Sequence, residues 1–145
     1  MKTCKIKLLN DNAKLPTKGT DDAAGYDLYS SEAILARKGC TTFIPTGIAI
    51  ELPKGHAGFI HSRSGLTKDW GLVVANGVGV IDSDYRGEVG VLIYNQGKYD
   101  KILEEGTRVA QLVIQEVPEV TLVEEVGDMS DTKRGDGGFG HTGTL

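Results

Sequence analysis

The stretch that decides the fold runs from Ala75 to Asn95 and reads ANGVGVIDSDYRGEVGVLIYN. Two strongly apolar runs flank a compact polar cluster at 82–87, which carries a tyrosine, an arginine and two carboxylates. The apolar runs, 72–81 and 88–95, predict two strands that pair across this cluster. Asp82 would lie at the rigid end of the first strand, where a general base could be held. A charged hairpin turn explains the same residues without any chemistry.

The rest of the chain shows the same strand signals. One short helix is expected at 64–71, capped by Ser64 or Thr67. Pro45 marks an edge strand or a bulge. Strands separated by breaks rich in Gly, Pro or Asn favour a β-sandwich or barrel. The remaining strand patterns lie at 5–9, 41–52, 56–61, 99–103, 108–117 and 121–126.

Bulk composition limits the classes of function. The chain has 145 residues, which suits one domain, and a net charge of −4, which disfavours binding to a nucleic acid polymer. A small phosphorylated ligand stays compatible, because a few placed arginines suffice for it. Cys4 and Cys40 lack metal-site spacing. The N-terminus lacks a signal peptide and no run approaches a membrane span, so we expect a soluble, cytoplasmic protein without membrane contact.

The last stretch changes character. From 127 to 145 the chain is polar and rich in glycine, so we predict a core domain at 1–126 followed by a flexible arm at 127–145. Its segment RGDGGFGHT could curl backbone N–H groups around an anion, although the lysine of a Walker loop is missing. Arg134 and Thr142 would add donors, and Phe139 could stack on a flat ring. A disordered tail is the alternative.

Four further residues can each be interpreted in two ways. Arg63 and Ser64, at the start of the expected helix, could hold a phosphate or could simply cap the helix. Asp27 could tie a loop or could contact Mg²⁺ through water. Gln111 is a polar residue within an apolar strand, so it either faces inward and must be paired or occupies an outward-facing edge position.

Each segment is weak alone, but their order is informative. The segments AAGYDL, SRSGL, NGVGVIDSDYRGEV, GTRVAQL and RGDGGFGHTG follow one another from Ala23 to Gly143. In order and spacing they closely resemble the five motifs of the homotrimeric deoxyuridine triphosphatase (dUTPase) family. The resemblance implies an all-β, jelly-roll-like fold and a homotrimer that exchanges its C-terminal arms. It also implies hydrolysis of dUTP to dUMP and pyrophosphate with Mg²⁺, through in-line attack of water on the α-phosphorus.

The resemblance also assigns roles. Asp82 matches the residue that orients and deprotonates the attacking water, and Tyr85 matches the tyrosine under the deoxyribose, where its ring would exclude a 2′-hydroxyl. Asp27 matches an acidic residue that holds the water shell of the metal. Uracil would be read by the segment that includes Asn76 and Gly79. Phosphate binding and stacking on uracil would fall to Arg63, Ser64, Gly65, Gln111, Arg134, Phe139, Gly140 and Thr142.

Two rival functions follow from the same residues. A deoxycytidine triphosphate deaminase, which shares this fold and trimer, would carry a glutamate three residues before Asn95, where this chain has Leu92. Leucine cannot shuttle a proton, so deamination is disfavoured. A regulatory role, in which a dUTPase also binds an unknown protein partner, is compatible with every motif.

Overall fold

The computed structural model describes residues 2–139 and 141, so two predicted arm residues, Gly140 and Thr142, lie outside the described residues. Ten strands and one helix make up this part of the chain. In chain order they are β1 (Lys5–Leu8), β2 (Tyr26–Tyr29), β3 (Ile34–Ala36), β4 (Thr41–Glu51), β5 (His56–His61), α1 (Ser64–Trp70), β6 (Leu72–Val74), β7 (Gly79–Ile81), β8 (Glu88–Asn95), β9 (Lys101–Leu103) and β10 (Arg108–Glu116).

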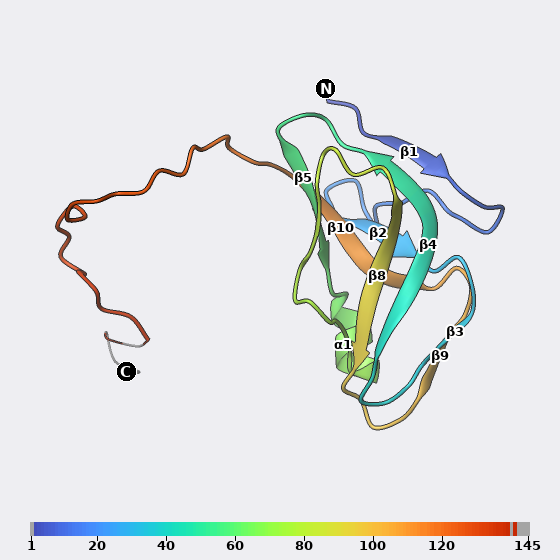
Figure 1. Cartoon of the computed structure of the whole chain (residues 1–145). Coiled ribbons are helices and arrows are strands. Elements are labelled where there is room, and N and C mark those ends of the chain that lie inside the picture. The colour runs from blue at the N-terminus through green and yellow to red at the C-terminus, as the bar shows by residue number, and fades with distance from the viewer. Residues whose placement is uncertain (1, 140, 142–145) are drawn as a thin grey trace.

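Two antiparallel sheets form the body of the molecule (Figure 1). Each of them has four strands. One has the strand order β1-β4-β8-β6 and the other β2-β10-β5-β7, while β3 and β9 form a small separate ribbon. Branched and apolar side chains alternate inward along the strands, as a half-buried sheet requires. Ile44 and Ile93 from the first sheet and Ile60 and Leu112 from the second belong to one buried cluster. The all-β, jelly-roll-like prediction is confirmed.

The predicted pairing of 72–81 with 88–95 is confirmed for the first part of 72–81 and wrong for its second part. Only β6 pairs with β8, whereas β7 crosses to the other sheet and pairs with β5. The chain turns between them because Gly77 adopts a left-handed φ of 74°, which favours glycine, and the Val78 N–H donates to the Asn76 carbonyl. The polar cluster at 82–87 therefore connects the two sheets instead of closing a hairpin.

Two smaller predictions also differ from the structure. The helix is present, but its N-cap is Arg63 without a side-chain hydrogen bond, so neither Ser64 nor Thr67 caps it. Pro45 borders a register shift between β4 and β8, which confirms the bulge. No helix in the described part of the chain is long and apolar enough to cross a membrane.

The expected strand at 121–126 is wrong for the single chain. Beyond β10 the backbone runs clear of both sheets without forming a strand (Figure 1). Its apolar side chains are exposed, Leu122 at 93% and Val126 at 91%. The sequence alternates as a strand does, but a strand needs a neighbour to accept its hydrogen bonds, and this segment meets none in the described part of the chain.

Candidate active site

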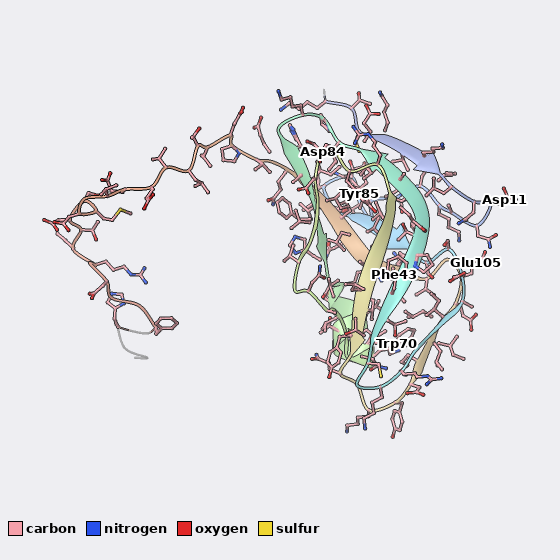
Figure 2. All side chains as sticks on the ribbon, viewed as in Figure 1. Asp11, Phe43, Trp70, Asp84, Tyr85 and Glu105 are labelled. Carbon is pink, nitrogen blue, oxygen red and sulfur yellow. The ribbon has the colours of Figure 1, made fainter. Side chains whose placement is uncertain are left out.

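The loop between β7 and β8 borders a pocket of about 330 Å³, which we call the Asp82 pocket. Four residues predicted from the sequence line it: Asn76, Gly79, Asp82 and Tyr85. The sequence did not single out the apolar part of its wall, in which side chains of β7 and β8 meet residues from strands more distant in the sequence, such as Phe43 of β4 and Ile60 of β5. Figure 2 labels one of them, Phe43, beside β4 and β8, together with Tyr85. The apolar wall comprises Phe43, Ile60, Val74, Val80, Ile81, Val89, Val91 and Leu92.

Asp82 directly follows β7, so the sheet fixes its backbone while its side chain is exposed. Among the described residues, its carboxylate has no hydrogen-bond or ion-pair partner within the structure. The other acidic residue of the pocket, Glu88, is engaged, because its Oε1 accepts a hydrogen bond from the Gly47 N–H at 2.8 Å. Asp82 is therefore the carboxylate of this pocket that is free to accept a hydrogen bond from water or a ligand.

The loop around Asp82 is held by its own contacts. The Tyr85 N–H donates to the Asp82 carbonyl at 3.1 Å, and the Tyr85 hydroxyl donates to the Glu88 carbonyl at 2.8 Å. Nη1 of Arg86 donates to the carbonyls of Ser83 and Tyr85, both at 2.8 Å. Arg86 thus ties the loop together, and the tyrosine ring is fixed at the edge of the pocket.

A second pocket, of about 280 Å³, contains five more of the predicted residues, and we call it the Asp27 pocket. The register of β10 explains how they meet, because Gln111 lies opposite Asp27 on β2 and opposite His61 on β5. The chain leaves β5 and enters α1, which adds the adjacent residues. The predicted residues that line this pocket are Asp27, Arg63, Ser64, Gly65 and Gln111.

Asp27 lies between two arginines. Its Oδ1 is 2.9 Å from Nε of Arg63 and its Oδ2 is 3.3 Å from Nη1 of Arg108, while its side chain is 14% exposed. Two guanidinium groups against one carboxylate leave this pocket with an excess positive charge, which suits an anion such as a phosphate. Sequence reasoning missed Arg108, although it begins the same strand and the same motif as Gln111.

The two pockets share no lining residue, but Ser62 connects them. Its hydroxyl accepts a hydrogen bond from the Val74 N–H at 2.8 Å, and Val74 lines the Asp82 pocket. Its carbonyl accepts from Nε2 of Gln111 at 3.0 Å, on the side of the Asp27 pocket. Gln111 is half-buried and faces this pocket, opposite the core-facing Ala110 and Leu112, so the expectation of an inward-facing amide is not met. The pockets therefore lie on different sides of one connecting residue.

The described residues of the arm line neither pocket in the single chain. Arg134 donates from Nε to the Gly137 carbonyl at 2.8 Å, which closes a local turn. Phe139 is fully exposed and adopts a left-handed φ of 48°. Neither residue lines the Asp82 pocket or the Asp27 pocket.

The clear pKa shifts lie away from both pockets. A hydrogen bond from Lys5 lowers the pKa of Glu51, and one from Lys2 lowers the pKa of Glu116. Burial raises the pKa of the Cys4 thiol. In the part of the chain that the structure describes, no group of three or more His, Cys, Asp or Glu residues gathers as a metal site would require.

The sequence is similar to those of known enzymes over nearly its whole length. The chain is 44% identical to the deoxyuridine 5′-triphosphate nucleotidohydrolase of Syntrophotalea carbinolica, over 97% of each chain. It is 45% identical to the enzyme of the same name from Clostridium tetani, also over 97% of each.

The fold is also similar to that of solved dUTPase structures. The dUTPase of Staphylococcus bacteriophage 80alpha, with dUPNHPP, superposes with a TM-score of 0.91 at 30% identity, covering 98% of this chain and 99% of that one. The D95N dUTPase of phage phi11, described with a structural Mg(II) ion, superposes with a TM-score of 0.77 at 30% identity. The superposition covers 86% of this chain and 98% of that one. The model of the dUTPase family matches residues 11–143. The chain therefore belongs to the dUTPase family.

Proposed function

We propose that this protein is a dUTP diphosphatase, which hydrolyses dUTP to dUMP and pyrophosphate. The observation that carries the proposal is the carboxylate of Asp82, fixed at a strand end and without a partner among the described residues. In the reaction, a water oxygen bonds to the α-phosphorus as the bond to the bridging oxygen of the β-phosphate breaks. Asp82 accepts the water proton, and pyrophosphate leaves with the bond electrons. One positioned base contributes about 10²- to 10⁴-fold in rate.

The Asp82 pocket supplies recognition of the nucleoside. Asn76 and the backbone amides beside Gly79 would pair with the polar edge of uracil, while the apolar wall receives the ring. Cytosine presents an amino group where uracil presents a carbonyl oxygen, so a polar edge built for uracil would reject it. The ring of Tyr85, held by the Glu88 carbonyl, would pack on the deoxyribose and leave no room for a 2′-hydroxyl.

The Asp27 pocket supplies recognition of the triphosphate. Arg63 and Arg108 would exchange part of their contact with Asp27 for phosphate oxygens, and Ser64, Gly65 and Gln111 would add donors. Mg²⁺ fits here through water, because it binds proteins through one or two carboxylates together with substrate phosphates. Asp27 is the acidic residue of this pocket and would hold that water shell. When bound, the ion neutralises charge on the phosphates.

A complete site would combine residues from more than one copy of the chain. The two pockets share no lining residue, and in this proposal a single nucleotide takes the contacts to uracil from one copy and the contacts to its phosphates from another. We propose a homotrimer, in which the arm at 127–145 closes on a neighbouring site. The exposed apolar side chains of the preceding segment support this, since they are unprotected in the single chain. Arg134 would then meet the terminal phosphates and Phe139 would stack on uracil.

The test is a comparison of three nucleotides. Purified protein with Mg²⁺ is mixed separately with dUTP, dCTP and UTP, and both pyrophosphate and ammonia are measured. Release of pyrophosphate from dUTP at a far higher rate than from dCTP or UTP is the expected result. Ammonia from dCTP would instead identify a deaminase, and equal rates with dUTP and UTP would remove the role of Tyr85.

A further inference from the structure

Gly87 lies two residues after Tyr85, just before β8, and the tyrosine ring occupies the space where a side chain would project. A Cβ placed on Gly87 would lie 2.6 Å from Cζ and 3.0 Å from Cε2 of Tyr85, and closer still to the hydroxyl oxygen. All three of the nearest atoms belong to this one ring. Real Cβ atoms do not approach other atoms so closely, so any larger residue at this position forces the ring to move.

The backbone at this position does not itself demand glycine. The glycines with left-handed φ include Gly77 and Gly71 but not Gly87, so an alanine could adopt the same backbone conformation without strain. The requirement for glycine therefore comes from the tyrosine ring and not from the turn.

A hydrogen bond at its tip also holds the ring. The Tyr85 hydroxyl donates to the Glu88 carbonyl at 2.8 Å, and the ring is 44% exposed at the edge of the Asp82 pocket. The ring can reach this carbonyl only by passing across the bare Cα of Gly87. The missing side chain and the hydrogen bond together fix where the face of the ring meets the pocket.

We propose that Gly87 is a positioning residue for substrate selection: it fixes the ring of Tyr85 and thereby sets the discrimination between deoxyribose and ribose. The inference rests on the proposed function, in which Tyr85 packs on the sugar. Alanine at position 87 would lift the ring from the Glu88 carbonyl, shift its face relative to the sugar, and relax the exclusion of a 2′-hydroxyl.

The test is a double-mutant cycle with Gly87→Ala, Tyr85→Ala and the double variant, measuring kcat/KM for dUTP and for UTP. Gly87→Ala should lower the dUTP-to-UTP ratio by about tenfold, since residues in direct contact are strongly coupled. In the Tyr85→Ala background the same substitution should change the ratio less than about twofold, because the obstacle is gone. Tyr85→Phe, which keeps the ring and loses the hydrogen bond to Glu88, separates the two restraints on the ring.

A wild-type ratio in Gly87→Ala would overturn the inference, and so would an equal loss from this substitution with and without the ring. The melting temperatures of the same variants are also measured, so that Gly87→Ala remains informative even if it folds poorly. The double variant should have the same melting temperature as Tyr85→Ala. A wild-type protein that does not prefer dUTP to UTP would instead refute the proposed function.

Discussion

Asp27 and Asp82 are two carboxylates of one chain in opposite surroundings. Asp27 is 14% exposed and each of its oxygens faces a guanidinium group, at 2.9 and 3.3 Å. Asp82 is exposed at a strand end, and in the described structure neither of its oxygens meets a donor. The contrast teaches that a carboxylate paired with two arginines holds their guanidinium groups in place. A carboxylate that is positioned but unpaired can instead accept a proton. The predictions below probe that difference.

The largest effect should come from Asp82→Asn. The amide keeps the shape of the side chain but cannot take the proton of water, so kcat should fall by about 10²- to 10⁴-fold. Binding of a non-hydrolysable dUTP analogue, measured by calorimetric titration, should stay within about threefold of wild type. Normal turnover by this variant would remove Asp82 as the base.

Removal of the arm comes next in size. A chain ending at Lys133 keeps both pockets but loses Arg134 and Phe139, so the substrate would be less well enclosed and aligned. Steady-state assays should show kcat reduced by about a hundredfold, as expected when reacting groups are slightly misplaced. The melting temperature should hardly change, because those of the deleted residues that the structure describes are not part of either sheet. Full activity after truncation would contradict the closing role of the arm.

Asp27→Asn should have an intermediate effect of a different kind. The substitution leaves Arg63 and Arg108 without their shared carboxylate and weakens the hold on the water shell of Mg²⁺. The Mg²⁺ concentration for half-maximal activity should rise by about ten- to a hundredfold. Glu51→Gln is the matched control, since it removes the same charge from an exposed ion pair with Lys5 and should leave the Mg²⁺ dependence unchanged. If this Mg²⁺ concentration rose in both variants, the effect would be due to the net charge of the protein and not to Asp27.

The smallest effect belongs to an exposed ion pair far from both pockets. Lys2 lowers the pKa of Glu116 in the folded protein, so this pair stabilises the fold above the unfolded pKa of the carboxyl group. The contribution disappears as the pH falls through the lowered value. Denaturant titrations should find Glu116→Gln slightly less stable than wild type at pH 7. The two proteins should become equally stable once the pH lies below the lowered pKa, where the side chain at position 116 is neutral in both. A difference that grows in acid would contradict the assignment.

Local patterns predicted much of this molecule. Alternating apolar residues identified β5 and β8 with their observed bounds, and Gly71 ended the short helix where glycine can adopt a left-handed conformation. The split of 72–81 between two sheets was missed, because periodicity reports which residues face inward but not which strand they pair with. The strand at 121–126 failed because its alternation had no partner within one chain.

For the site, too, features within one stretch of sequence were predicted, whereas contacts between distant segments were missed. The polar cluster at 82–87 drew attention to Asp82 and Tyr85, but the roles of Asn76, Asp82 and Tyr85 came from the resemblance to the dUTPase motifs. Arg108 was missed because an arginine at the start of a strand is unremarkable until the register places it beside Asp27. The apolar wall around Phe43 and Leu92 was missed for a similar reason, since it forms only when β4 and β8 lie side by side.

The central claim is that one active site takes its general base, Asp82, from one copy of the chain and its phosphate-binding residues from another. Complementation between two inactive variants tests this claim most directly. Asp82→Asn and Arg63→Ala are unfolded together, refolded as a one-to-one mixture and assayed with dUTP. Random assembly of a symmetric trimer with shared sites should restore about one quarter of the wild-type activity. A mixture no more active than the two variants assayed separately would show that each site lies within a single chain, and would contradict the account.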